Sequence, residues 1–176
     1  MNYVRDAAMT ALIFGFFASA WFGWAQERPP AGWKKWLGIA GGASLALAAT
    51  GGFLAWRHWS DGSALSEPGA MRSYGITLGI EVVVAAAGAI AFGVRHHREL
   101  IAPWVCFVVG AHFIPLAGPL QSPILYPLAV IMILVAVGTV PYARRHELAP
   151  SAVTGVGAGV ALFICAAVSL VLAMTL

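Results

Sequence analysis

The stretch LIAPWVCFVVGAHFIPLAGPLQSPILYPLAVIMILVAVGTVPYA, from Leu100 to Ala143, contains no aspartate, glutamate, lysine or arginine. A helix needs about 20 mostly apolar residues to cross the hydrocarbon core of a bilayer, so this stretch has about twice the length of one crossing. Turn-forming residues lie at its middle, in the sequence GPLQSP from Gly118 to Pro123. The pattern predicts two spanning helices joined by a tight hairpin. A re-entrant element is the alternative, because irregular backbone is tolerated at membrane depth where protein or a water-filled cavity covers it.

The whole chain shares this apolar character. Of its 176 residues, 60% are hydrophobic and 10% are charged, whereas an ordinary soluble domain has about 25% charged residues. Six apolar stretches between charged residues are each long enough to span a membrane. We therefore predict an all-α, polytopic integral membrane protein with one domain, a compact bundle of six transmembrane helices. The expected spans are 7–26, 36–56, 74–94, 100–119, 123–142 and 152–175.

Lysine and arginine are distributed unevenly between the two sides of such a bundle. Because loops rich in these residues stay in the cytoplasm, we predict a multi-pass protein of the cell membrane, of the bacterial inner-membrane type, with both termini on the outer side. No basic patch interleaved with aromatic residues indicates nucleic-acid binding. The side with loops after the first, third and fifth spans carries Arg28, Lys34, Lys35, Arg95, Arg98, Arg144 and Arg145, and the other side carries Arg5, Arg57 and Arg72.

Small residues recur at four-residue spacing in four of the expected helices. In a bilayer such residues let helix backbones approach closely, because lipid leaves no hydrophobic force to drive helices together. We expect these stripes to pack the bundle internally, although the same device also forms homodimers. The stripes are Gly15, Ser19 and Gly23; Gly38, Gly42, Ala46 and Thr50; Gly75 and Gly79; and Gly155 and Gly159.

Two ionisable residues lie well inside predicted spans, Glu81 in the third and His112 in the fourth. At 1.5 Å per residue, both are roughly 10–12 Å below the outer boundary of their spans. Consecutive antiparallel helices are usually neighbours, so we expect Glu81 to contact His112. An ionisable residue at the membrane centre costs about 3 kcal/mol, and it marks a functional site by default.

Other polar residues and two prolines lie at a similar level. Tyr74, Thr77 and Glu81 share one face of a helix, while Asp6 and Thr10 give the first helix a polar entrance. Pro115 and Pro119 remove backbone donors next to His112, and we expect them to kink that helix. The predicted ligand- or proton-binding set is Glu81, His112, Thr77, Thr50, Tyr126 and Tyr74.

These residues predict an outward-facing polar cavity that binds or translocates a small solute or a proton. The alternative is a membrane scaffold or partner subunit, in which Glu81 and His112 form a structural bond between helices. An intramembrane enzyme is less favoured, because the chain has no GxSxG or HExxH sequence and no zinc-ligand spacing, and we assign no catalytic residue, metal or cofactor. The expected partners are the lipid bilayer, a small-molecule ligand, and a second copy or another membrane subunit.

Overall fold

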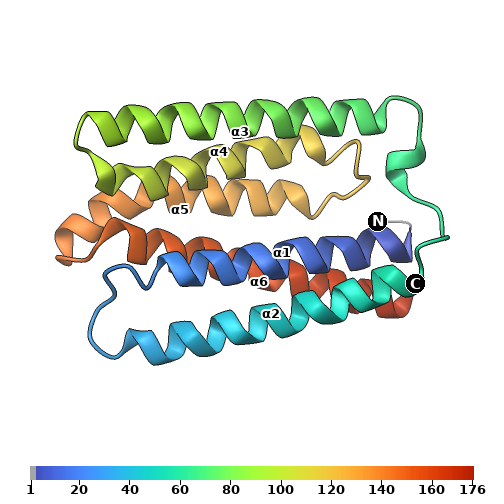
Figure 1. Ribbon diagram of the computed structural model, residues 1–176, viewed down its shortest axis with the longest axis horizontal. Coiled ribbons are helices and arrows are strands. Elements are labelled where there is room, and N and C mark those ends of the chain that lie inside the picture. The colour runs from blue at the N-terminus through green and yellow to red at the C-terminus, as the bar shows by residue number, and fades with distance from the viewer. Residues whose placement is uncertain (1–2) are drawn as a thin grey trace.

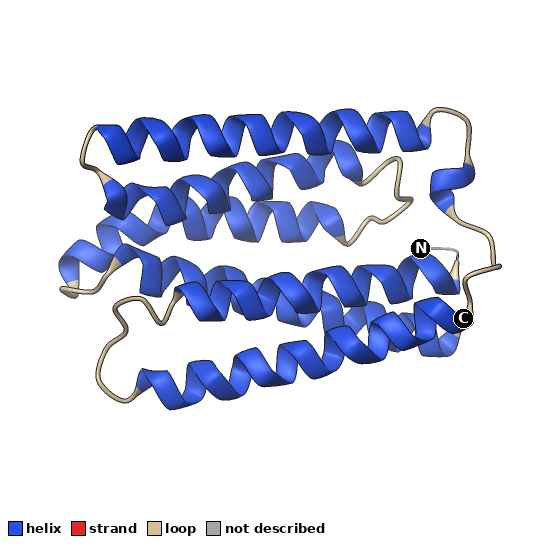
Figure 2. Ribbon diagram, viewed as in Figure 1, coloured by secondary structure: helices blue, strands red, loops and turns tan. Residues whose placement is uncertain are grey.

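The computed structural model describes residues 3–176 and shows helices but no strands in this range (Figures 1 and 2). Six of the helices are long and apolar enough to cross a membrane when the short η2 helix is counted with α4. The predicted all-helical chain with six candidate spans is therefore confirmed. The elements are α1 (Val4–Trp24), α2 (Trp33–Arg57), η1 (Ala64–Ser66), α3 (Ala70–Val94), η2 (Arg98–Leu100), α4 (Ile101–Leu116), α5 (Leu125–Arg145) and α6 (Pro150–Thr175).

The α4–α5 connection is longer than expected. The two helices form a hairpin, as predicted, but α4 ends at Leu116 and α5 begins at Leu125. The hairpin is thus not tight. Pro115 lies in the last turn of α4, and Pro119 lies in the loop, so the expected helix kink at Pro119 is wrong. Pro115 and Pro119 each lack a backbone donor, about one turn apart, and the helix ends between them.

The helices lie nearly side by side in an elongated bundle with unequal packing (Figure 1). Helix α1 lies between α2 and α6, α4 pairs with α5, and α6 also contacts α4 and α5. An edge contact between the rings of Phe14 and Phe113, with centroids 5.4 Å apart, joins α1 to α4. Helix α3 occupies one edge of the bundle and packs on α4, and Ala70 is its one buried residue.

Glycine positions show where helix backbones meet. A Cβ on Gly15 of α1 would lie 2.8 Å from the Ser44 carbonyl of α2, and a Cβ on Gly155 of α6 would lie 2.6 Å from the Trp21 carbonyl of α1. A Cβ on Gly159 would meet the Phe22 ring at 2.8 Å. For these three glycines, the expected internal packing is confirmed.

The predicted stripe on α2 and the glycine pair on α3 do not pack internally. Gly38, Gly42, Gly75 and Gly79 are exposed, and a Cβ on any of them would meet nothing within 4 Å. Helix α2 turns another face towards α1 and α6. Its buried positions recur at the helical period, but on a different face from the predicted stripe. These positions are Leu37, Ser44, Ala48, Gly51 and Ala55.

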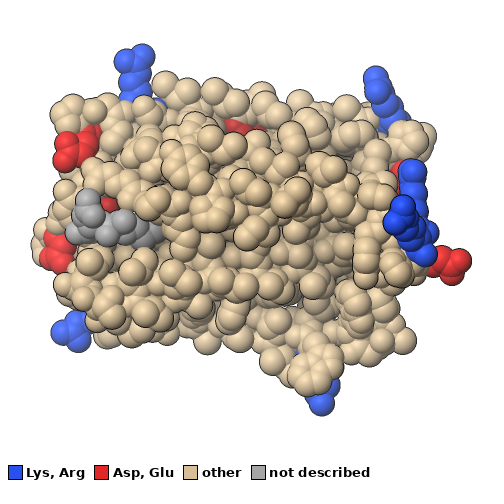
Figure 3. All heavy atoms as spheres, turned by 180° about the vertical axis from the view of Figure 1, so that it is seen from behind, with Lys and Arg blue, Asp and Glu red and all other residues tan. Residues whose placement is uncertain are grey.

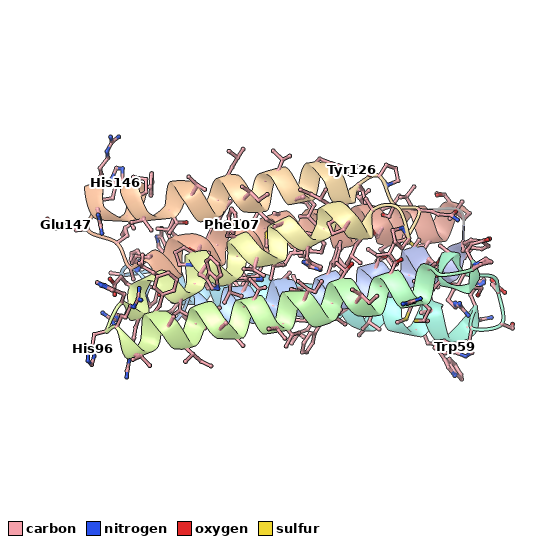
Figure 4. The ribbon with its side chains drawn as sticks, turned by 90° about the horizontal axis from the view of Figure 1, so that it is seen from above. Trp59, His96, Phe107, Tyr126, His146 and Glu147 are labelled. Atoms are coloured by element: carbon pink, nitrogen blue, oxygen red, sulfur yellow. The ribbon has the colours of Figure 1, made fainter. Side chains whose placement is uncertain are left out.

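Charged residues gather at the two ends of the bundle, and the broad belt between them is uncharged except for one small acidic patch (Figure 3). The connections α1–α2, α3–α4 and α5–α6 lie at one end, which we call the basic end because seven of the ten lysines and arginines belong to it. The start of α1, the end of α6 and the other two connections lie at the opposite end, which we call the terminal end. Figure 4 shows His96, His146 and Glu147 at the basic end, and Trp59 and Tyr126 towards the terminal end.

Candidate functional site

The contact expected between the two ionisable residues inside the candidate spans is present. The Glu81 Oε2 atom on α3 lies 3.4 Å from the His112 Nε2 atom on α4, an ion-pair distance slightly longer than an ordinary hydrogen bond. Both side chains are mostly buried, with 14% of Glu81 and 11% of His112 exposed. The shared depth inferred from the sequence therefore placed the two residues correctly relative to each other.

The depth of the pair differs from the expected value. Helix α3 begins at Ala70 rather than at residue 74, because Gly69 before it adopts the left-handed conformation with a φ of 80°. Glu81 is consequently about 17 Å along α3 from its first residue, at 1.5 Å per residue, which is close to the middle of this 25-residue helix. The pair thus lies nearer the middle of the bundle, between its two charged ends, than the sequence indicated.

The other ring nitrogen of His112 has its own partner. Nδ1 lies 2.6 Å from the carbonyl oxygen of Val109, one turn earlier on α4. A backbone carbonyl can only accept a hydrogen bond, so Nδ1 is the donor. The same helix that supplies His112 therefore also fixes the orientation of its ring, with Nε2 directed at α3.

The polar stripe predicted on α3 faces α4. Tyr74, Thr77, Glu81 and Gly88 are all partly buried, while most of their neighbours in the helix are exposed. Tyr74 also packs against the main core cluster. Thr77 precedes Glu81 by one turn on the same face. The structure thus gathers four of the six predicted binding residues, Glu81, His112, Thr77 and Tyr74, along the α3–α4 contact.

The remaining two predicted binding residues lie elsewhere. Thr50 belongs to α2, at the edge of the bundle opposite α3, where its exposed hydroxyl donates to the Ala46 carbonyl of its own helix at 3.0 Å. Tyr126 lies in the first turn of α5 and is 51% exposed, on the side of the bundle away from α3 (Figure 4). A single cavity lined by all six residues is therefore not what the structure forms.

Asp6 and Thr10 are bonded to backbone groups rather than open to a polar entrance. The Asp6 carboxylate accepts a hydrogen bond of 2.7 Å from the Ala64 amide at the start of η1, and the Thr10 hydroxyl donates to the Asp6 carbonyl at 2.8 Å. The guanidinium of Arg5 donates to the Trp59 carbonyl at 2.9 Å. The first turn of α1 thus anchors the connection between α2 and α3.

A second polar contact between α3 and α4 was not recognised from the sequence. The Trp104 indole N–H donates to the Val84 carbonyl of α3 at 3.2 Å. A Cβ on Gly88 would overlap the Trp104 indole, so glycine at this position admits the ring. A tryptophan opposite a glycine in the same helix pair is the sequence signal that could have indicated it. Helix α3 thus makes one ionisable and one neutral polar contact with α4, next to an edge contact between the Phe92 and Trp104 rings.

The half of the bundle nearer the basic end also contains polar contacts between helices. The Thr154 hydroxyl of α6 donates to the Thr139 hydroxyl of α5 at 3.2 Å, and both residues are buried. The Cys106 thiol donates to the Met132 carbonyl at 3.4 Å. These contacts join α5 to its neighbours α4 and α6, which supports a structural role.

Two hollows on the surface of residues 3–176 lie away from the ionisable pair. One is lined by Phe53, Trp56 and Arg57. The other lies between α3, α4 and α5 and is lined by Phe92, Leu100, Pro103, Trp104, Phe107, Ala136 and Val137. Within the same residues, no group of three or more histidine, cysteine or acidic side chains is arranged to hold a metal ion.

Comparison of the chain with protein-family models, with curated proteins and with solved structures finds no match. The contacts of the structure define the candidate site as the Glu81–His112 pair, its Val109 carbonyl partner and the adjoining polar stripe of α3.

Proposed function

We propose that the chain is a multi-pass membrane protein that binds or translocates a proton or a small solute at Glu81 and His112. The observation that carries this proposal is the 3.4 Å contact between the two side chains across the α3–α4 interface. Both groups can change protonation, and imidazole is the side chain that titrates nearest neutral pH. Exchange takes place with the compartment that faces the terminal end, which the distribution of lysine and arginine assigns to the outside.

The packing of α3 supports a site that can open. Helix α3 packs on α4 and keeps most of its surface outside the protein. A modest displacement of α3 would expose the pair without disturbing the packed contacts among α1, α2 and α6. Elements with few buried contacts are the ones that open at the lowest free energy.

The same observation also favours a second candidate, a membrane scaffold or partner subunit in which the pair only fastens α3 to α4. Hydrogen bonds between transmembrane helices contribute about 0.6–2 kcal/mol each. A helix with one main neighbour depends on such bonds more than a helix in the centre of a bundle. In that case, the ionisable character of the pair would be unimportant, and only its bonding would matter.

Flux measurements on reconstituted liposomes distinguish the two candidates. The probes are a trapped pH-sensitive dye under a potassium diffusion potential, for protons, and light scattering after osmotic shock with glycerol or urea, for small solutes. We expect the wild type to show pH-dependent flux of one probe. We expect Glu81→Gln and His112→Ala to reduce that flux to the level of protein-free liposomes, because each removes a titratable group.

Trp104→Phe is the matched control, since it removes the neutral α3–α4 contact and leaves both titratable groups in place. Under the proposal, its flux keeps the pH dependence of the wild type. If Trp104→Phe and Glu81→Gln change flux equally, or if no variant that remains helical changes it, the pair is a fastening and the scaffold function holds.

A further inference from the structure

The Val109 carbonyl determines which nitrogen of His112 is available to a ligand. Nδ1 lies 2.6 Å from that oxygen, which can only accept, so Nδ1 carries a hydrogen. In neutral imidazole the other nitrogen then has a lone pair and no hydrogen. Nε2, the nitrogen that faces Glu81, is therefore an acceptor whenever His112 is neutral.

An ionised Glu81 opposite this nitrogen would place two acceptors face to face. Glu81 Oε2 and His112 Nε2 lie 3.4 Å apart, and a carboxylate has no hydrogen to donate. One added proton resolves the conflict. It can reside on Nε2, giving an imidazolium and a carboxylate, or on the carboxyl, giving a neutral imidazole and a neutral acid.

Both one-proton arrangements leave the pair with no net charge. Removing the proton gives a net charge of −1, and adding a second gives +1, in a part of the bundle surrounded by apolar side chains. Isolated charge is disfavoured there, so the one-proton state is favoured over both neighbours. Two groups coupled in this way titrate as a unit rather than separately.

No other ionisable side chain among residues 3–176 forms an ion pair with either member. On the elements packed against the pair, the Cys106 thiol bonds to the Met132 carbonyl and Asp6 bonds to the Ala64 amide. Tyr74 lies two turns from Glu81 on α3. The other titratable or charged groups of these elements lie near the helix ends or on α6, namely Arg5, Arg72, Arg98, Glu99, Tyr126, Tyr142, Arg144, Arg145 and Cys165.

We infer that the ligand of this site is a single proton, shared between Glu81 and His112 Nε2 and held in register by the Val109 carbonyl. This inference rests on the proposed function in taking the pair as the ligand site, and it goes further in naming the ligand and its number. The empty site takes up one proton from water, and the occupied site releases one proton to water. The hydrogen on Nδ1 stays in place in both steps. The 3.4 Å between the two acceptor atoms leaves room for one hydrogen between them, and the burial of both side chains leaves little access for a larger solute.

The proton also bridges α3 and α4. With it in place, the two side chains attract each other across the interface, and without it they repel. Release of the proton therefore loosens the attachment of α3, which then depends on its other contacts with α4, namely the Trp104–Val84 hydrogen bond and the Phe92–Trp104 ring contact. Proton occupancy and the position of α3 are coupled through the same pair of atoms.

Nitrogen NMR on liposome-reconstituted protein with ¹⁵N-histidine tests the inference directly. The chain has five histidines, and replacing His58, His96, His97 and His146 with Gln leaves His112 as the one labelled residue. We expect Nδ1 to stay protonated across the accessible pH range. Infrared spectroscopy of the same sample measures the protonated carboxyl of Glu81, identified as the band that Glu81→Gln removes.

The decisive quantity is the sum of the protonated Nε2 fraction and the protonated Glu81 fraction. We expect this sum to be one per chain at neutral pH, and we expect both fractions to change together if the pair loses its proton at higher pH. An unprotonated Nδ1, a sum of zero or two at neutral pH, or two independent titrations would overturn the inference. If Glu81→Gln does not fold, Glu81→Asp serves instead, because it shifts the carboxyl band without removing it.

The outcome of the flux assay does not depend on the outcome of this measurement, so the proposed function and the inference can fail separately. A sum of one together with unchanged flux in Glu81→Gln would show that the pair holds a proton statically, and the proposed function would fall. A sum other than one together with lost flux would leave the site functional, with a solute other than a proton as its ligand, and the inference would fall.

Discussion

Helices α1 and α3 are both apolar enough to span a membrane, yet they are held in the protein by different means. Helix α1 packs against α2 and α6 through glycines, at distances where no side chain fits between the backbones. Helix α3 packs mainly on α4, and two polar contacts, Glu81 with His112 and Trp104 with Val84, join them. The first interface depends on close packing of helix backbones, and the second depends on polar and ionisable side chains.

This difference separates the part of the molecule that must stay fixed from the part that can move. Backbone packing fails steeply when any atom is added, because a packed interface cannot relax without separating helices. A contact made by two ionisable side chains depends on protonation and can be switched. The α1–α2–α6 group therefore serves as the frame, and the α3–α4 contact carries the candidate site.

Gly155→Ala should break the frame and give the largest effect. The added Cβ would lie 2.6 Å from the Trp21 carbonyl and 2.8 Å from the Ala25 Cβ atom, so α6 must separate from α1. Overpacking of this kind costs about 1–3 kcal/mol of unfolding free energy. Reversible unfolding in mixed micelles, followed by circular dichroism, measures the loss.

Gly79→Ala is the control for this substitution, because a Cβ there meets nothing within 4 Å. We expect it to leave the unfolding free energy unchanged or to raise it by up to about 1 kcal/mol, through the better helix propensity of alanine. Equal losses in Gly155→Ala and Gly79→Ala would contradict the division into a frame and an edge helix. They would indicate that the exposed face of α3 is packed in the membrane, for instance against a second copy.

Trp104→Phe should loosen α3 alone and give an intermediate effect. It removes the 3.2 Å hydrogen bond to the Val84 carbonyl, and such bonds between membrane helices contribute about 0.6 kcal/mol on average. Hydrogen exchange in micelles, analysed by peptide, should show faster exchange in α3 and unchanged exchange in α1 and α6. Faster exchange throughout the bundle would show that α3 belongs to one cooperative unit with the frame.

The number of helices and the Glu81–His112 contact could be predicted from the sequence, because both depend on quantities that a sequence records. Apolar length between charges gives the spans, and residue counting from a shared boundary gives the relative depth of two residues on adjacent helices. The predicted contact is present, although the expected depth of Glu81 along its helix was wrong. Glu81 lies near the middle of α3, but His112 lies opposite it in either case.

The phase of the small-residue stripes and the membership of the site could not be predicted in the same way. Spacing of four residues shows that Gly38 and Gly42 share a face with Thr50, but not whether that face turns inward. Helix α2 buries Ser44 and Ala48 instead, because its position is set by α1 and α6. Counting residues along each helix gives the depth of a polar residue but not the lateral order of the helices. In the structure, this lateral order separates α2 from α3.

Thr50→Val sharpens the comparison with the smallest expected effect. The Thr50 hydroxyl is exposed and bonds to the Ala46 carbonyl of its own helix, which remains paired within the helix when valine replaces threonine. We therefore expect a change in unfolding free energy within about 0.5 kcal/mol and flux equal to that of the wild type. The liposome assay checks the second expectation next to Glu81→Gln. Loss of flux in Thr50→Val would mean that the ligand path passes along α2, and the site would then have to extend across the bundle rather than stay at the α3–α4 contact.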